Sequence, residues 1–125
     1  MSTRLLIADD NRDMVASLSL LLRRQGFDVA VAYDGDKAIE TARSFAPDIL
    51  ILDLCMPVLG GLEVANHLRA LPEFSGKVFI AIIGYTDYEH LDQVSQAQFD
   101  EYLIKPFPLD RFMSILAQVS HQIDQ

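Results

Sequence analysis

The sequence has little cysteine and no long apolar run. Cys55 is the single cysteine among 125 residues, so an internal disulfide is excluded and a reducing, cytoplasmic setting is expected. No apolar stretch approaches the length that a membrane span needs. The start, MSTRLLIADD, lacks the apolar stretch of a secretion signal because Asp9 and Asp10 interrupt it. We therefore expect no association with a membrane.

Basic residues are also scarce. The chain has 10 lysines and arginines against 18 aspartates and glutamates, and its formal net charge is -8. Direct nucleic-acid binding needs a basic face, so we do not expect it of this domain. An acidic chain is compatible with a bound metal cation or with docking to a basic partner surface. The length suits one domain with one core, and we expect residues 1–125 to form it.

Short apolar runs alternate with amphipathic segments along the chain. The runs predict strands at residues 4–8, 27–33, 49–52, 78–83 and 102–104. Helices are predicted at 11–25, from the turn Asp34–Gly35 to Phe45, from Gly60–Gly61 to Leu71, at 87–96, and from Pro108 onward. Strands that alternate with helices form parallel βαβ units. The predicted fold class is therefore α/β, with a doubly wound five-stranded parallel sheet of order 2-1-3-4-5.

Charged residues stand where the apolar runs end. Asp9 and Asp10 follow the first run, Asp53 follows the third, and Lys105 follows the fifth. Ligands bind to such sheets outside the carboxyl ends of the strands, and this strand order makes the first and third strands neighbours. We therefore expect the four side chains to converge on one site. Three clustered carboxylates repel one another, so Lys105 and a divalent metal ion are expected to balance them.

The same positions carry a known set of motifs. An acidic pair follows the first strand, an Asp the third and Lys105–Pro106 the fifth, while Met56–Pro57 and Gly61 lie in the loop DLCMPVLGG. In this order and spacing, the chain resembles the receiver domain of a two-component response regulator, similar to the chemotaxis regulators. The resemblance covers nearly the whole chain and implies a flavodoxin-like (βα)5 fold.

The resemblance implies a phosphoryl transfer. Asp53 is implied as the nucleophile, which takes the group from the phosphohistidine of a sensor histidine kinase or a histidine phosphotransfer protein. Lys105 is implied as the cation that stabilises negative charge on the phosphoryl oxygens during the transfer. The activity would be self-phosphorylation followed by slow autodephosphorylation, and not the turnover of a free substrate.

The resemblance also implies Mg²⁺ as the cofactor. Asp10 and Asp53 would bind the ion directly, Asp9 would bind it through a water molecule, and Cys55 would bind it through its backbone carbonyl. Mg²⁺ prefers octahedral oxygen ligands and keeps several waters, so a ligand set of this size is sufficient.

The implied output is a conformational shift that a partner recognises. The partner is expected to be a downstream protein effector or a fused output domain, and it would bind the face of the fourth helix, the fifth strand and the last helix. Tyr102, Phe107 and Phe112 are candidate apolar residues near that face. A chain that starts MSTRLLIADD is expected at the amino terminus of its protein, as a single-domain regulator or as the receiver of a longer chain.

Ile83 departs from the family pattern. Receivers usually have Thr or Ser at the end of the fourth strand, where the hydroxyl binds the phosphoryl group, and Ile has no such group. The conformational switch is therefore expected to be weakened or rerouted. Tyr102 stands where the family has a rotating aromatic residue, although it also fits an ordinary strand residue at the surface. Thr86 is an alternative hydroxyl if its loop folds inward.

Two other functions remain open. One is a pseudo-receiver, a protein-interaction module that works without phosphorylation; Ile83 favours it, and the intact acidic residues and lysine oppose it. The other is a Mg²⁺-dependent phosphatase with an Asp nucleophile. Those enzymes resemble a DxDx[TV] pattern after the first strand, whereas here the candidate nucleophile, Asp53, follows the third.

Overall fold

Strands and helices alternate along the chain as the apolar pattern predicts. The computed structural model describes residues 2–84 and 99–123. The elements are β1 (Arg4–Ala8), α1 (Arg12–Arg24), β2 (Asp28–Ala32), α2 (Gly35–Phe45), β3 (Ile49–Asp53), α3 (Gly61–Arg69), a 3-10 helix (Pro72–Phe74), β4 (Val78–Ile83), β5 (Glu101–Ile104) and α5 (Leu109–Ile123). The predicted helix at 87–96 and the alternative hydroxyl of Thr86 lie outside the described residues.

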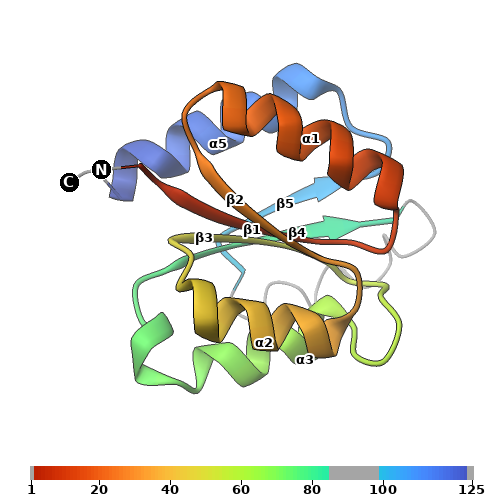
Figure 1. Ribbon diagram of the computed structural model, residues 1–125, viewed down its shortest axis with the longest axis vertical. Coiled ribbons are helices and arrows are strands. Elements are labelled where there is room, and N and C mark those ends of the chain that lie inside the picture. Colours follow the sequence, from red (N-terminus) through yellow and green to blue (C-terminus); the bar gives the residue numbers. More distant parts are fainter. Residues whose placement is uncertain (1, 85–98, 124–125) are drawn as a thin grey trace.

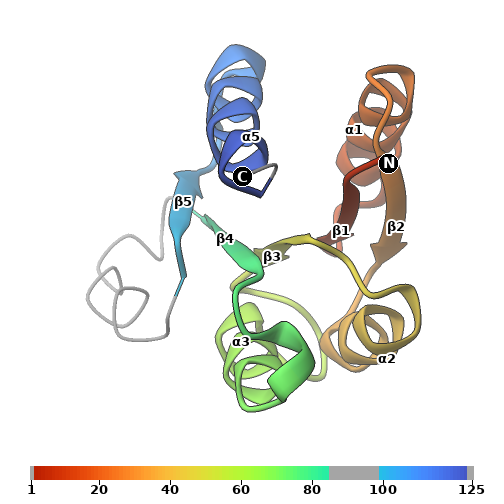
Figure 2. The ribbon, with the colours of Figure 1, turned by 90° about the vertical axis from the view of Figure 1, so that its left-hand side faces the viewer.

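The strands form one parallel sheet of order β2-β1-β3-β4-β5, which confirms the predicted topology. Helices α1 and α5 cover one face of the sheet, and α2 and α3 cover the other (Figure 1). Viewed along the strands, the order runs from β5 to β2 with helices on both sides (Figure 2). The winding reverses between β1 and β3, so their carboxyl ends lie next to each other.

Alternate residues of each strand face opposite sides of the sheet, and the strands therefore build two cores. The core under α1 and α5 includes Leu5, Ile7, Ile49, Ile51, Ile80, Ile82, Val15, Leu22, Phe112 and Leu116. The core under α2 and α3 includes Leu6, Ala8, Leu50, Leu52, Phe79, Ala38, Val64 and Leu68. Burying one such Leu or Ile contributes about 1.5–3 kcal/mol. A strand with both faces buried can be only in the middle of the sheet, as β1, β3 and β4 are.

Side-chain caps define where the first two helices begin. The Asn11 Oδ1 atom accepts a hydrogen bond of 3.1 Å from the Met14 N–H at the start of α1. Asp34 Oδ1 likewise accepts one of 2.8 Å from the Lys37 N–H. The predicted turn at Asp34–Gly35 was therefore wrong in its boundary, because the cap makes Gly35 the first residue of α2. None of the helices in the described part of the chain combines the length and apolar character that crossing a membrane requires.

Strand ends differ slightly from the prediction. Phe27, expected in the second strand, instead donates its N–H to the Leu22 carbonyl of the preceding helix, so β2 begins one residue later. The strand β3 is one residue longer than predicted, because Asp53 pairs with Ile82 of β4. The position of Asp53 is therefore set by the sheet and not by the loop that follows it.

The start of β5 is attached to β4 and α3 by Asp100. Asp100 Oδ2 accepts hydrogen bonds from the Phe79 N–H at 2.8 Å and from Arg69 at 2.9 Å. Arg69 also donates to the Lys77 carbonyl at 2.9 Å, and its guanidinium lies 4.0 Å from the centre of the Phe79 ring. One carboxylate oxygen thus joins three elements at the amino-terminal end of the sheet.

We expect Asp100→Ala to lower the free energy of unfolding by about 2 kcal/mol, because the N–H of buried Phe79 and the Arg69 guanidinium both lose their acceptor. Asp100→Asn keeps a carbonyl oxygen and should retain most of the stability. Urea unfolding measures both variants, with Asp28→Ala on an exposed strand residue as the control. An Asp100→Ala variant as stable as the control would contradict this role.

Candidate active site

The alternation along the strands brings three of the predicted charged residues together. Asp9, Asp53 and Lys105 each stand two positions after a core residue of the face that α1 and α5 cover. Asp9 and Asp53 are buried, at 0% and 3% exposure, although both are carboxylates. Because β1 and β3 are neighbours, the two acids lie side by side at the carboxyl ends of the strands, as predicted.

Each buried carboxylate has one oxygen held by the backbone and one that faces the lysine. Asp9 Oδ1 accepts the Asn11 N–H at 2.9 Å, and Asp53 Oδ1 accepts the Cys55 N–H at 3.1 Å. The Lys105 Nζ atom lies 2.8 Å from Asp9 Oδ2 and 3.5 Å from Asp53 Oδ2. The lysine therefore bridges the acids, and the backbone N–H groups fix the orientation of both carboxylates.

Asp10 completes an oxygen cluster that suits a hard cation. Oxygens of Asp9, Asp10 and Asp53 lie within 4.8 Å of one another, with Asp10 exposed and the other two buried. Asp9 Oδ2 is buried and accepts no hydrogen bond from the residues that the structure describes, although the Lys105 ammonium is close enough for an ion pair. With three carboxylates and one lysine, the charges do not balance. A divalent cation bound by oxygen would restore the balance and use the Asp9 oxygen that lacks a hydrogen bond.

Burial and the neighbouring charges shift the pKa of two groups. Burial raises the pKa of Asp53 to about 6; the Cys55 N–H and Lys105 lower it, and the Asp9 charge raises it further. Burial lowers the pKa of Lys105, but the contact with Asp9 and the charges of Asp53 and Asp9 outweigh this effect and raise it overall. Without a metal ion, Asp53 therefore loses its proton as the pH rises through about 6, whereas Lys105 keeps its charge.

Ile83 is the last residue of β4, as the sequence predicts. It is fully buried and packs with Ala81, Leu54 and Phe99 on the face opposite to α1 and α5. Its carbonyl accepts the Lys105 N–H at 2.8 Å, so its backbone still positions the lysine. The side chain adds apolar packing and offers no hydrogen bond.

The residues expected on the output face divide into two groups. Tyr102 on β5 is 45% exposed and, with Phe107 and Arg111, lines a shallow hollow of about 260 Å³. Phe112 is only 1% exposed and belongs to the core under α1 and α5. Its ring stacks on that of Phe107, with 5.8 Å between the ring centres. The expectation that Phe112 lies near a partner surface was therefore wrong, because its position on α5 points toward the sheet.

Glycine determines how closely the loop after Asp53 can fold. A Cβ atom on Gly61 would lie 2.5 Å from the Asp53 carbonyl oxygen, and one on Gly60 would overlap the Leu54 carbonyl oxygen. The sequence indicated only a turn and a helix start at this pair. The structure shows that α3 begins directly against the backbone that carries Asp53, which no residue other than glycine permits.

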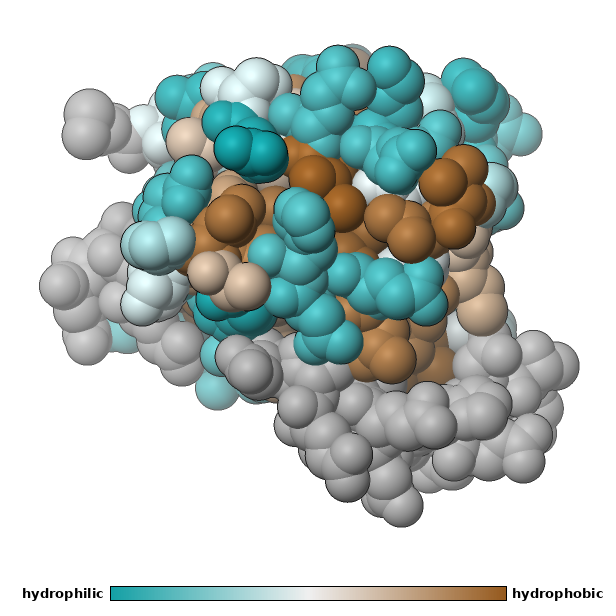
Figure 3. Space-filling view, turned by 90° about the horizontal axis from the view of Figure 1, so that it is seen from below, coloured by the Kyte–Doolittle hydropathy of each residue, from teal (hydrophilic) through white to brown (hydrophobic). Residues whose placement is uncertain are grey.

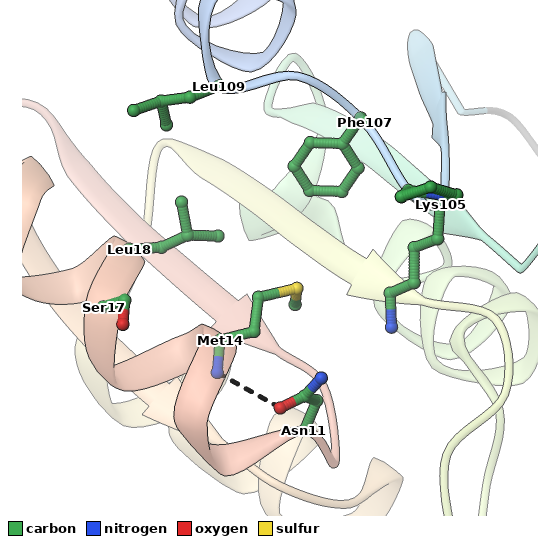
Figure 4. A pocket seen from close by; sticks show the side chains of 8 residues that line it. Asn11, Met14, Ser17, Leu18, Lys105, Phe107 and Leu109 are labelled. Atoms are coloured by element: carbon green, nitrogen blue, oxygen red, sulfur yellow. Dashed lines mark hydrogen bonds between the residues drawn. The ribbon is translucent and has the colours of Figure 1, made fainter.

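An apolar hollow of about 560 Å³ adjoins the site, which the sequence did not indicate. Met14 and Leu18 of α1 form one wall, and Phe107 and Leu109 form the other (Figure 4). Lys105 closes the end nearest the carboxylates. The lining residues come from two helix starts that are distant in the sequence, so only the folded chain brings them together.

The fold and the acidic site define a receiver domain of a response regulator. The sequence matches the response regulator receiver domain family over residues 5–117, and the chain belongs to this family. PrrA of Mycobacterium tuberculosis, a transcriptional regulatory protein, is 40% identical over 110 residues, which are 86% of this chain and 46% of PrrA. MtrA of the same species, a DNA-binding response regulator, is 32% identical over an alignment of 126 positions, which covers 100% of this chain and 54% of MtrA. The chain thus spans about half the length of these curated relatives.

Solved structures agree with this assignment. The REC domain of AraT, a response regulator from Geobacillus stearothermophilus, has a TM-score of 0.88 and 29% identity, covering 100% of this chain and 98% of its own. The receiver domain of the sensor histidine kinase PA1611 from Pseudomonas aeruginosa has a TM-score of 0.83 and 25% identity, covering 94% and 97%. In that structure, a magnesium ion is coordinated in the active site cleft.

The raised pKa of Asp53 predicts a pH-dependent stability in metal-free protein. The folded pKa of about 6 exceeds the ordinary value of 3.8. The protonated Asp53 therefore contributes stability to the fold. This stability is fully present below pH 3.8 and is lost as the pH rises through about 6. A shift of this size corresponds to at most about 3 kcal/mol.

We therefore expect Asp53→Asn to be more stable than the native chain by about 1–3 kcal/mol at pH 8 in a chelator, and equal to it near pH 4. Chemical unfolding across this pH range measures the difference. Asp28→Asn, which removes an exposed carboxylate far from the site, serves as the control. A constant difference between Asp53→Asn and the native chain at all pH values would show that burial does not disfavour the Asp53 charge.

Proposed function

We propose that this domain receives a phosphoryl group on Asp53 from a phosphohistidine and signals through the resulting change of charge. The observation that carries the proposal is the geometry of Asp53. One of its oxygens is held by the Cys55 N–H at 3.1 Å, and the other lies 3.5 Å from the Lys105 ammonium. A carboxylate held in one orientation beside a fixed cation is suited to attack phosphorus in line.

The transfer uses these groups in defined roles. A carboxylate oxygen of Asp53 forms a bond to phosphorus as the bond between phosphorus and the histidine nitrogen breaks, and the electron pair returns to the imidazole. The Lys105 ammonium stabilises the charge on the phosphoryl oxygens, since it is already placed between Asp9 and Asp53. Burial of Asp9 and Asp53 lowers the polarity of their surroundings and strengthens both interactions.

Mg²⁺ is the proposed cofactor. Asp10 and Asp53 would hold it directly, Asp9 through a water, and Cys55 through its backbone carbonyl. When bound, Mg²⁺ would neutralise the carboxylates and supply further positive charge to the phosphoryl oxygens. The oxygen cluster and the buried Asp9 oxygen without a hydrogen bond support this assignment.

The phosphoryl donor is proposed to be a sensor histidine kinase or a histidine phosphotransfer protein that docks over the hollow beside the site. Its walls are apolar, and Leu109 at its rim is 50% exposed. An apolar side chain of the donor could bury itself there while the phosphohistidine faces Asp53. A few well-buried anchor side chains carry most of the binding energy of a typical interface.

The output is proposed to pass to a downstream protein effector or to a fused output domain. We place the receiver in the cytoplasm as one domain, residues 1–125, that contacts neither nucleic acid nor membrane itself. Ile83 and Tyr102 are the proposed switch positions. Because Ile83 is buried and has no hydroxyl, the movement of Tyr102 is expected to be smaller than in receivers with Thr or Ser at this place.

Phosphorylation is tested by the intact mass after incubation with acetyl phosphate and Mg²⁺. One added phosphoryl group is expected, because Asp53, Lys105 and the acidic cluster are all in place. Asp53→Asn and a chelator should each abolish it. An adduct that persists in Asp53→Asn would show that another residue is the acceptor.

No adduct from acetyl phosphate or from a panel of phosphohistidine donors would favour the pseudo-receiver, a protein-interaction module that works without phosphorylation. The missing hydroxyl at Ile83 would then account for the lost switch. Steady turnover of a phosphate ester, in place of a single adduct, would instead indicate a phosphatase.

The docking hollow makes a separate prediction. Leu109→Asp should lower the rate of transfer from a phosphohistidine donor by about tenfold, since it places a charge in the apolar anchor site. Phosphorylation by acetyl phosphate should stay unchanged. Leu20→Asp is the matched control, because Leu20 is 53% exposed and does not line the hollow. Docking in this hollow would be contradicted if both variants lowered the transfer rate equally. It would also be contradicted if Leu109→Asp lowered the rate of phosphorylation by acetyl phosphate.

A further inference from the structure

The loop after β3, residues 54–60, contains a residue in a backbone conformation that its side chain disfavours. Val58 has a φ of 72°. A β-branched residue is rare in this left-handed region, because its Cβ comes too close to the following carbonyl oxygen. Val58 is also 70% exposed, so burial of the side chain does not compensate for the strain. The conformation must therefore be held by the backbone around it.

Two hydrogen bonds to one carbonyl hold this conformation. The Leu59 N–H donates to the Pro57 carbonyl at 2.9 Å, across Val58. A bond from residue i+2 back to residue i around a positive φ forms the rarer and more strained kind of γ-turn. The Pro57 carbonyl also accepts the Gly35 N–H at 3.2 Å. The γ-turn is thus tied to the first residue of α2.

Close packing leaves the loop little freedom elsewhere. A Cβ on Gly35 would overlap the Leu59 carbonyl oxygen, so α2 and the loop touch through their backbones. At the base of the loop, the Gly61 N–H donates to the Leu54 carbonyl at 3.2 Å. The loop is therefore clamped at its base and against α2, and Val58 lies between the two clamps.

We propose that Val58 makes this loop a two-state hinge. The strained state is the one seen here, in which the Pro57 carbonyl binds the Gly35 and Leu59 N–H groups. In the relaxed state, Val58 returns to a negative φ and the carbonyl releases both. Strained backbone is retained in proteins mainly at functional sites, where the strain keeps two arrangements close in energy.

The hinge connects the candidate acceptor to a second surface. On one side, the loop contains Cys55, whose N–H orients the Asp53 carboxylate. On the other side, Leu59 lines a hollow of about 580 Å³ with Ile39 and His67. This hollow lies on the face of α2 and α3, where apolar side chains gather between hydrophilic ones (Figure 3). Opening of the hinge would move Leu59 and change the shape of that face. Only the connection between the hinge and Asp53 as the phosphoryl acceptor rests on the proposed function.

Amide hydrogen exchange of the metal-free protein tests the hinge. After correction for intrinsic rates, the Gly35 and Leu59 amides should exchange at least about tenfold faster than the Val78 amide, which donates to the Asp48 carbonyl at the other end of the sheet. Val58→Asn should slow the exchange of Gly35 and Leu59 relative to Val78 by roughly tenfold, because Asn tolerates a positive φ. Val58→Thr is the matched control, since it remains β-branched and should exchange as the native chain does.

Native Gly35 and Leu59 amides that exchange as slowly as Val78 would overturn the hinge. Equal exchange in Val58→Asn and Val58→Thr would do the same, because strain at residue 58 would then be irrelevant. The exchange is measured without metal or phosphoryl donor. A hinge without a phosphoryl adduct would therefore count against the proposed function alone, and an adduct without a hinge would count against this inference alone.

Discussion

The site depends on the electrostatic cost of burying two carboxylates side by side. Asp9 and Asp53 are at most 3% exposed and lie at the ends of neighbouring strands. Like charges in a medium of low polarity repel strongly, and burial alone favours the protonated form. Lys105 offsets part of this cost through contacts of 2.8 and 3.5 Å. The remaining negative charge must be balanced by protons or by a cation, which links the proposed metal binding to pH and to the protonation of Asp53.

The topology of the sheet is what makes this burial possible. The winding reverses between β1 and β3, so two strands distant in sequence end next to each other with their carboxylates on one face. The strand ladder holds Asp53 itself, and the loop beyond it is held through glycine contacts to α2 and α3. Asp53, the proposed phosphoryl acceptor, is thus held by the sheet on one side, whereas on the other side it is followed by a loop that contains a strained residue. We regard this contrast as the structural feature on which the proposed hinge depends.

Much of the fold follows from local patterns. The strands at 78–83 and 49–52 are apolar on every position, and only a central place in a parallel sheet buries both of their faces. Asp9 and Asp53 could be placed together because the predicted strand order makes the first and third strands neighbours. The boundary at Asp34 was harder to place, because an Asp–Gly pair is equally typical of a turn and of a helix cap, and the choice depends on whether the Lys37 N–H lies within reach.

Other features depend on contacts between distant segments. The apolar spacing placed Phe112 on one helix face with Ile115, Leu116 and Val119. Only the packing on the sheet showed that this face is buried and does not form a partner surface. The hollow between α1 and α5 and the clamped loop around Val58 likewise require segments that the sequence separates widely. No local pattern signals a positive φ at a valine, since the preference of that residue is for the opposite conformation.

The sequence by itself determined the order of the strands, because burial on two faces and the parallel connections leave few alternatives. It also determined the family, through the charged residues near the carboxyl ends of the strands. The tertiary structure alone decided which oxygens face Lys105, which carboxylate oxygen remains without a hydrogen bond, and where the backbone holds strain. These properties depend on distances of a few tenths of an ångström between atoms from different strands and loops. Such distances result from the packing of the whole domain, so no pattern within one segment can encode them.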